Sequence, residues 1–543
     1  RTLAGIGTDL ANAGESLTLA VHPDSLEVVD GRLPLAEVRR ITPKLEAGSA
    51  VLTSALHRVD SLRDDPYLAP QVHDAIDKIH GQLAQAEGEA RRAAAAARLA
   101  PALFGGDSPR RYLLVVQNNA ESRATGGFIG SFGLMTALDG KLHVDPLDRT
   151  HVWNEATRAL PKATLSAPAD YLSRYGSFSP STTLQNVNLS PDFPSVAQAL
   201  MSQTQEVGLG KVDGVMAVDP EGLAALLELS GPVTVAGWPT PIDSGNVVNV
   251  TLRDAYAAFA ETPERADFLG DVAQAAVDQA TSGTLGKPAQ IAKVLGAAAH
   301  AGHITLAFAR PDEQRLADQL GIAQKVAPIR SDAVAVTTSN AGGNKLDYYF
   351  DRTIDYRVML HPSANLRSAA IDADLAVRLE NTASDSGLPS IVIGPYDDRF
   401  VAGQNRTYVS LYSGLDFRDA AVDGKAVAVS PGRERGRNVY SLLEDVFAKS
   451  NKTVTAKLSG RVALHAGWYD VVVRQQPTIN PDRVHVSVDV PKGWRIDRAP
   501  KMEQPFPQRA SVSALLAKTT TYRVHIVRDP ATWDLWQRLQ DGT

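Results

Sequence analysis

The sequence predicts an α/β domain that is preceded by a helical hairpin and followed by an all-β, sandwich-like domain. Three observations predict this order: helical apolar spacing in the N-terminal part, alternating strands and helices in the middle, and a two-residue period in the C-terminal part. We place the hairpin region at residues 1–104, the α/β domain at residues 105–328 and the sandwich-like domain at residues 329–543. A chain of 543 residues accommodates three domains of ordinary size.

The composition indicates a folded chain and argues against several classes of function. Hydrophobic residues make up 44% of the chain and can form large cores, while 21% charged residues argue against disorder. The net charge of -6, without any dense Lys/Arg block, gives no sign of a nucleic-acid partner. There is no cysteine, which excludes disulfides, a thiol nucleophile and cysteine metal sites. No apolar run has the length of a membrane span, and the start at Arg1 indicates a trimmed or processed product with a possible anchor upstream.

The N-terminal region reads as two long helices joined by a proline-rich turn. Residues 35–62 carry apolar residues at three- and four-residue steps, and we expect Pro43 to begin a helix there. Pro66 and Pro70 follow, and residues 72–103 contain an alanine run. An antiparallel hairpin of this kind is either a stalk below the sheet domain or a plain packing element.

The α/β domain opens with a buried strand at residues 112–116, followed by a polar, glycine-containing loop at residues 117–127 and a second strand at residues 128–138. Asp139-Gly140 predicts a two-residue hairpin turn, because both residues tolerate positive φ. We expect residues 161–191 to form a lid or binding loop, and Asp192 and Asp219 each to cap a helix. Further strands are expected at residues 211–218 and 303–308, and helices at 251–260, 263–280, 289–300 and 311–320.

The C-terminal domain shows alternating apolar and polar residues separated by turn residues. We predict strands at residues 333–336, 348–360, 371–379, 407–412, 453–458, 469–474, 484–490 and 521–527. This pattern is typical of a sandwich.

Familiar catalytic motifs are absent, which leaves carboxylates, amides and arginines near strand ends as candidates. There is no P-loop, dinucleotide fingerprint, H-E-x-x-H or G-x-S-x-G, and the histidines lack metal-ligand spacing, so we predict neither a metal site nor a cofactor. Glu121, Asp192 and Asp148 are the candidate catalytic carboxylates, since two positioned carboxylates suit glycoside chemistry. Each could equally serve as a helix cap or in a surface ion pair. The candidate substrate-binding residues from the same segments are Asn118, Asn119, Arg123, Thr125, Arg149 and Asn186.

One stretch carries a specific family resemblance. Gln117-Asn118, Glu121, Arg123 and the run Thr125-Gly126-Gly127-Phe128-Ile129-Gly130 resemble the signature of domain-of-unknown-function family 4012, found in actinobacteria and other Gram-positive bacteria. The resemblance extends over most of residues 20–530 and includes residues 190–194, 212–215, 219–220, 230–233 and 344–349. The family name implies no activity.

The order of elements also resembles, more distantly, that of the LytR-CpsA-Psr enzymes, which join glycopolymers to peptidoglycan through a lipid-diphosphate donor. Asp148-Arg149 lies where that family has a Pro-Arg-Asp segment, and residues 250–274 resemble its arginine-bearing helix, which adds Arg265 to the candidate binding residues. The Arg-Ser-Asp-Thr of those enzymes is replaced by residues 123–127. Fewer arginines and an added Glu121 favour a neutral sugar chain over a diphosphate, because phosphate oxygens need cationic partners.

We therefore expect an extracytoplasmic, secreted or membrane-anchored, carbohydrate-active enzyme. Its partner would be a polysaccharide or oligosaccharide of an actinobacterial cell wall, such as arabinan, which it would cleave or transfer as a glycoside hydrolase or transglycosylase. Two alternatives stay open. One is a LytR-CpsA-Psr-like phosphotransferase, which would need Mg²⁺, and the other is a non-catalytic glycan-binding scaffold.

Overall fold

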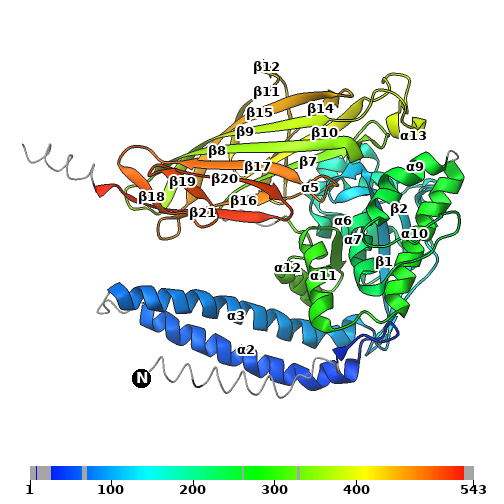
Figure 1. Ribbon diagram of the computed structural model, residues 1–543, viewed down its shortest axis with the longest axis horizontal. Coiled ribbons are helices and arrows are strands. Elements are labelled where there is room, and N and C mark those ends of the chain that lie inside the picture. Colours follow the sequence, from blue (N-terminus) through cyan, green and yellow to red (C-terminus); the bar gives the residue numbers. More distant parts are fainter. Residues whose placement is uncertain (1–7, 9–25, 64–69, 260–261, 327–330, 531–543) are drawn as a thin grey trace, which may run out of the picture.

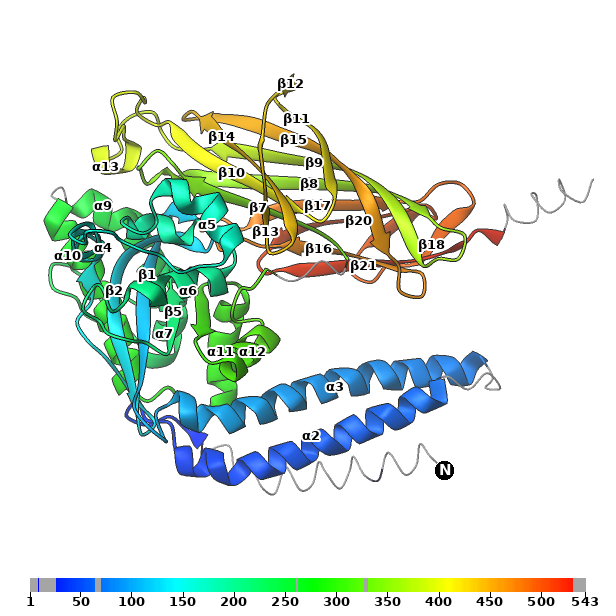
Figure 2. The ribbon, with the colours of Figure 1, turned by 180° about the vertical axis from the view of Figure 1, so that it is seen from behind.

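The computed structural model describes residue 8 and residues 26–63, 70–259, 262–326 and 331–530. Within these ranges the chain forms a helical hairpin, a mixed α/β domain and two large β-sheets (Figures 1 and 2). Pro66, which we placed in the hairpin turn, lies outside the described residues. No helix in the described part is both long and apolar enough to cross a membrane.

The hairpin consists of α2 (Leu35–Arg63) and α3 (Pro70–Leu103), close to the predicted limits. The two helices pack on a small core formed by Ala55, Val59, Ile76 and Leu83. Pro43 lies inside α2 instead of beginning a helix, so that expectation was wrong. In Figure 1 the hairpin starts below the α/β domain and runs back beneath the β-sheets.

The α/β domain contains a six-stranded mixed sheet with the strand order β3-β2-β1-β5-β6, in which β4 also pairs with β2. β1 and β5 are parallel, and every other pair is antiparallel. Asp139 and Gly140 both have positive φ and close the predicted hairpin turn. The strands are β1 (Arg110–Arg123), β2 (Gly126–Leu138), β3 (Lys141–Val144), β4 (Asp148–Arg149), β5 (Gly214–Val218) and β6 (Ile304–Phe308).

Helices cover both faces of this sheet, because alternate side chains of β1 point to opposite sides. Leu113 and Val115 join a core with α6, whereas Tyr112 and Leu114 join a core with α7, α10 and α11. Asp219 caps α7 as predicted, since its carboxylate accepts the Gly222 N–H. The helices are α4 (Thr150–Arg158), α5 (Ala169–Tyr175), α6 (Phe193–Gln203), α7 (Pro220–Ser230), α8 (Val247–Asn249), the π-helical turn η4 (Val250–Asp254), α9 (Ala255–Ala258), α10 (Thr262–Ser282), α11 (Pro288–His300) and α12 (Pro311–Leu320).

The segment 161–191, which we expected to be a lid or binding loop, contributes several side chains to the core. It contains α5 and two short 3₁₀ turns, Gly176–Phe178 and Leu184–Leu189. The rings of Tyr171 and Tyr175 are fully buried, which fixes the segment against the sheet. The sequence did not predict this packing, because the segment has neither a helical nor a two-residue hydrophobic period.

The C-terminal region forms two sheets, with the strand orders β13-β14-β10-β7-β16-β21-β18 and β12-β11-β15-β9-β8-β17-β20-β19. Val409 and Val471 of the first sheet share a hydrophobic cluster with Val377 and Val486 of the second, so the sheets pack face to face. All eight predicted strands are present, in β7 (Asp332–Asn340), β8 (Phe350–Pro362), β9 (Ser368–Asn381), β10 (Asn405–Ser413), β15 (Ser450–Ala463), β16 (Trp468–Arg474), β17 (Asp482–Asp489) and β21 (Thr520–Arg528). The strands that sequence reasoning missed are β11 (Asp416–Val422), β12 (Lys425–Ala426), β13 (Ser430–Glu434), β14 (Arg437–Val446), β18 (Trp494–Arg498), β19 (Glu503–Phe506) and β20 (Arg509–Leu516).

Candidate functional site

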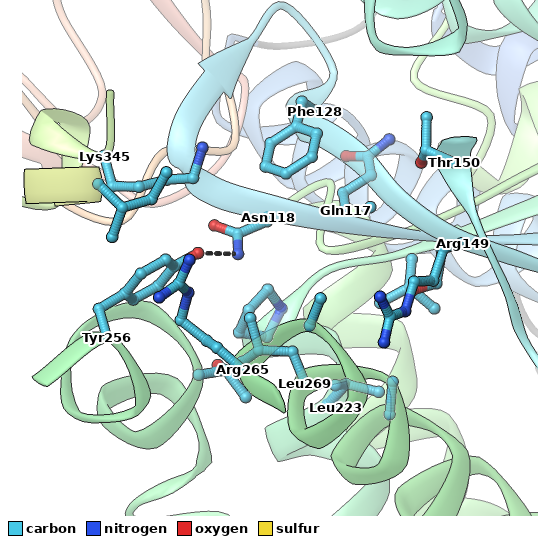
Figure 3. Close-up of a pocket in the computed structure, with 18 of the residues that line it drawn as sticks. Gln117, Asn118, Phe128, Arg149, Thr150, Leu223, Tyr256, Arg265, Leu269 and Lys345 are labelled. Atoms are coloured by element: carbon cyan, nitrogen blue, oxygen red, sulfur yellow. Dashed lines mark hydrogen bonds between the residues drawn. The ribbon is translucent and has the colours of Figure 1, made fainter. Parts of the chain in front are cut away.

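A pocket of about 350 Å³ lies between the sheet, its helices and the C-terminal domain (Figure 3). β1, β2, β4, α4, α7, η4, α9 and α10 contribute side chains from the α/β domain. Lys345, in the segment between β7 and the 3₁₀ turn η5 (Leu346–Tyr349), and Ile391, in α13 (Ser390–Ile393), come from the C-terminal domain. Much of the wall is apolar and consists of Val116, Phe128, Pro220, Leu223, Ala266, Leu269, Ala273 and Ile391.

The polar groups of the pocket are dominated by hydrogen-bond donors. Arg149, Arg265 and Lys345 bring three cationic side chains. The others are the amides of Gln117 and Asn118, the hydroxyls of Ser131, Thr150, Thr251 and Tyr256, and the imidazole of His151. Among the described residues that line the pocket, none is an Asp or a Glu.

The first strand of the α/β domain is longer at this pocket than the sequence predicted. β1 continues from Val116 to Arg123, where we expected a loop. Its register with β2 shifts after Asn118, so residues 119–121 have no partner on β2 and form a bulge. A Cβ atom at Gly127 would lie 2.0 Å from the backbone of Asn118, so the close approach of the two strands requires glycine. The predicted polar loop is therefore a bulged strand.

Glu121 lies in this bulge, but its carboxylate is already paired. One oxygen accepts from Lys345 Nζ and the other from Arg123 Nη2 at 3.1 Å, and the side chain is only 12% exposed. Burial alone would raise the pKa of Glu121, but the two cations outweigh it and lower the pKa. We expected Glu121 to act as acid/base or as nucleophile; a general acid needs a raised pKa, so this environment opposes the acid role.

The other two predicted catalytic carboxylates lie elsewhere. Asp192 is fully buried at the start of α6, where its carboxylate accepts from the Val326 N–H at 2.8 Å and the Ser195 hydroxyl at 2.5 Å. Asp148 is exposed on β4. None of the three lines the pocket, so the expectation of a shared carboxylate site is not met by this pocket.

Three of the predicted binding residues do line the pocket. Asn118 Nδ2 donates to the Tyr256 hydroxyl at 2.8 Å. Arg149 pairs with Asp267, and Arg265 donates to the Phe259 carbonyl at 3.0 Å while its guanidinium lies 5.2 Å from the centre of the Tyr256 ring. Burial raises the pKa of Tyr256, which keeps its hydroxyl protonated.

The remaining predicted binding residues lie outside the pocket and form hydrogen bonds with other parts of the fold. Asn119 donates to Asp219 and to the Pro477 carbonyl of the C-terminal domain. Arg123 donates to the carbonyls of Gln185, Ser122 and Asn340. Thr125 accepts from Gln117 and Asn188, and Asn186 donates to the Phe178 carbonyl. Their polar groups are thus used by the fold and by the seam between the two domains.

Sequence reasoning missed Lys345 as a site residue. It belongs to the segment 344–349 that carried part of the family resemblance, but no periodicity placed that segment beside β1. The described residues contain no group of three or more His, Asp or Glu side chains arranged to hold a metal ion.

The solved structures to which the chain is weakly similar include a nutrient binding protein and two M1 zinc metallopeptidases, and no curated protein matches the chain. A nutrient binding protein of Legionella pneumophila subsp. pneumophila str. Philadelphia 1 is 7% identical, with a TM-score of 0.25 over 36% of this chain and 70% of that chain. A two-domain M1 zinc metallopeptidase bound to L-tryptophan is 9% identical, with a TM-score of 0.20 over 33% and 43%. An M1 zinc metallopeptidase from Deinococcus radiodurans is 11% identical, with a TM-score of 0.18 over 32% and 42%. The chain covers less than half of either metallopeptidase chain, and at these scores the likenesses carry no argument about function.

The match to a family model is shorter than we expected. The matching model covers residues 107–256, whereas the sequence resemblance suggested most of residues 20–530. The matched part contains β1, its bulge, β2, the turn η4 and Tyr256, and therefore much of the pocket wall. Residues 107–256 match the model of the family described as "Protein of unknown function (DUF4012)".

Proposed function

We propose that the pocket binds the lipid-diphosphate end of a glycan donor, and that the protein acts on envelope glycopolymers outside the cytoplasm. One observation carries this proposal: apolar walls and three cationic side chains share a pocket without a carboxylate among its described lining residues. An anionic amphiphile complements both parts of such a surface. The order of elements resembles that of the LytR-CpsA-Psr enzymes, which use a lipid-diphosphate donor, although residues 123–127 replace a motif of those enzymes.

The two parts of the ligand would be recognised by different forces. Phosphate oxygens accept charge-assisted hydrogen bonds from arginine and lysine, which are stronger than neutral ones. Prenyl carbons would lie against Leu223 and Leu269, where each buried methylene-sized group contributes about 0.8 kcal/mol. Figure 3 shows Arg265 near Tyr256 and Lys345, with Arg149 on the other side of the pocket. Cationic groups on both sides of the pocket suit a diphosphate better than they suit a ligand with a single negative charge.

In the transfer reaction, a hydroxyl of the acceptor glycan would attack the phosphorus that carries the donor sugar. The bond from that phosphorus to the bridging oxygen would break, the lipid phosphate would leave, and the hydroxyl proton would pass to solvent. Arg149, Arg265 and Lys345 would stabilise the charge on the departing phosphate. The Mg²⁺ of the phosphotransferase alternative would find no carboxylate ligand among the described lining residues.

Binding of geranylgeranyl diphosphate and of geranylgeraniol to the purified protein tests this proposal. We expect the diphosphate to bind at least about tenfold more tightly, because hydrogen bonds to charged groups contribute about 1.5–3 kcal/mol each. Arg265→Gln should reduce this preference about tenfold. Arg509→Gln, which removes an exposed arginine paired with Asp489, is the matched control and should change nothing. Equal affinity of the wild type for both lipids would overturn the proposal.

Cleavage or transfer of glycosidic bonds, for example in arabinan, stays a prediction that an activity assay must test. The geometry supports it less, because Glu121, Asp192 and Asp148 do not line the pocket. Incubation with arabinogalactan should release or rearrange oligosaccharides, and Glu121→Gln should abolish this if the carboxylate is catalytic. Retained glycan binding without turnover would favour the scaffold alternative.

A further inference from the structure

The C-terminal domain contributes directly to the pocket. Lys345 and Ile391 line it, although both lie outside the residues matched by the family model. The Lys345 N–H donates to the Val392 carbonyl at 3.1 Å, which ties the two segments together. The pocket therefore exists in this form only when the two domains are in contact.

The side chain of Lys345 is fixed in one direction by groups of the α/β domain. Its ammonium donates to the Glu121 carboxylate and lies 4.6 Å from the centre of the Phe128 ring. Both partners belong to the bulged end of the first hairpin, where Phe128 also lines the pocket. A free lysine side chain loses rotamer entropy when a ligand fixes it, and these contacts remove that cost before a ligand arrives.

The backbone around Lys345 is held as firmly as its side chain. Asp347 accepts from the Ser122 N–H of β1 at 3.1 Å and from Asn340 Nδ2 at 2.7 Å. Asp347 is 5% exposed, so this clamp between the domains is shielded from water. Residues 345–347 are thus anchored on the end of β1 at two points, through the ion pair of Lys345 with Glu121 and through the hydrogen bond from the Ser122 N–H to the Asp347 carboxylate.

Lys345 and Arg123 share the Glu121 carboxylate, and the buried carboxylate of Asp347 lies in the same cluster. Lys345 is the member of this cluster that lines the pocket. An anionic group that enters the pocket would therefore meet the ammonium of Lys345, and charge-assisted hydrogen bonds are stronger than neutral ones.

We propose that Lys345 is a specificity-determining residue that binds the anionic head group, and that Glu121 is a positioning residue that holds its ammonium at the pocket. The C-terminal domain is then part of the binding site and not a separate module. This inference rests on the proposed function, since it concerns the same pocket. The competing explanation is that Lys345 only pins the domains together, in which case its removal would lower stability without changing head-group preference.

The test compares the ratio of the dissociation constants for geranylgeraniol and geranylgeranyl diphosphate across variants of the full chain. Lys345→Met should reduce the ratio about tenfold, whereas Lys345→Arg should retain most of it because the charge is kept. Glu121→Gln should reduce the ratio less than Lys345→Met, since the ammonium remains but is held less firmly. Lys449→Met, which removes an exposed lysine paired with Asp385, is the control and should leave the ratio unchanged.

The outcomes separate the two proposals. If the wild type shows no preference for the diphosphate, the proposed function fails. If the wild type prefers the diphosphate and Lys345→Met keeps that preference, only the proposed role of Lys345 fails. The residue then serves only to hold the two domains together. Circular dichroism and the melting temperature show whether each variant is folded, and Lys345→Gln, which can still bond to Glu121, replaces Lys345→Met if the latter does not fold.

Discussion

Asp219 shows what local sequence can and cannot reveal about one side chain. Its capping of α7 was predicted from the Asp219-Pro220 pair, and the Gly222 N–H does donate to it at 3.0 Å. Its second oxygen accepts from Asn119 and lies 2.8 Å from His303 Nδ1, partners 100 and 84 residues away. The cap depends on neighbours in the chain, while the other contacts depend on the pairing of β5 with β1 on one side and with β6 on the other.

The contact between Asp219 and His303 predicts that the stability of the protein depends on pH. Burial alone would lower the pKa of His303, but the charge of Asp219, helped by Glu221, outweighs it and raises the pKa. A raised pKa means that the folded state favours the protonated imidazole, so the stabilisation is complete below the unfolded pKa of about 6.5 and is lost as the pH rises through the folded pKa.

Urea unfolding between about pH 6 and about pH 9 checks this expectation. The free energy of unfolding of the wild type should fall over this range more than that of His303→Gln, which cannot titrate. Parallel pH profiles for the two proteins would contradict the assignment.

At the scale of the elements, strands with a clean two-residue period were easy to predict. The burial of β8 alternates along almost its whole length, because one face packs in the sandwich and the other meets solvent. The end of β1 was missed because its polar side chains, which indicated a loop, are satisfied by groups of a distant domain. Seven further strands of the sandwich were also missed, although six of them form local hairpins, β11 with β12, β13 with β14 and β19 with β20.

The junction of β1 and β2 gives a prediction for a single glycine. Gly127→Ala should destabilise the protein by about 3 kcal/mol or more, because its Cβ would overlap the Asn118 backbone and the bulge would have to move. Gly176→Ala is the matched control, since its φ is −55° and nothing lies within 4 Å of the added atom. We expect the control to be neutral or about 0.5 kcal/mol more stable, as measured by chemical denaturation. A tolerated Gly127→Ala would mean that the bulge is not rigid.

At the scale of the whole molecule, buried polar groups join the α/β domain to the sandwich. Arg174 of α5 donates to the hydroxyls of Ser410 and Ser441, and its guanidinium lies 3.7 Å from the Glu434 carboxylate. Tyr175 donates to Glu434 at 2.8 Å. Such a seam favours unfolding of the two domains together.

Arg174→Met should therefore destabilise both domains by about 3–5 kcal/mol, because it leaves a buried carboxylate without its cation. Hydrogen exchange of β5 in the α/β domain and of β16 in the sandwich should accelerate together. Acceleration confined to one domain would show that the seam is not cooperative. Glu444→Gln, at an ion pair with Lys452 within the sandwich, is a control for which we expect little change.

The sequence alone determined the order of the three regions, the two long helices, the hairpin turn at Asp139-Gly140 and the family signature, because each depends on residues that are close in the chain. It also identified Asn118, Arg149 and Arg265, which do line the pocket. Only the tertiary structure showed that Glu121 and Asp192 are enclosed by partners and that Lys345 completes the pocket. The physical reason is that the charge state and exposure of a carboxylate depend on groups that reach it across the fold, and these groups leave no periodic trace in the sequence.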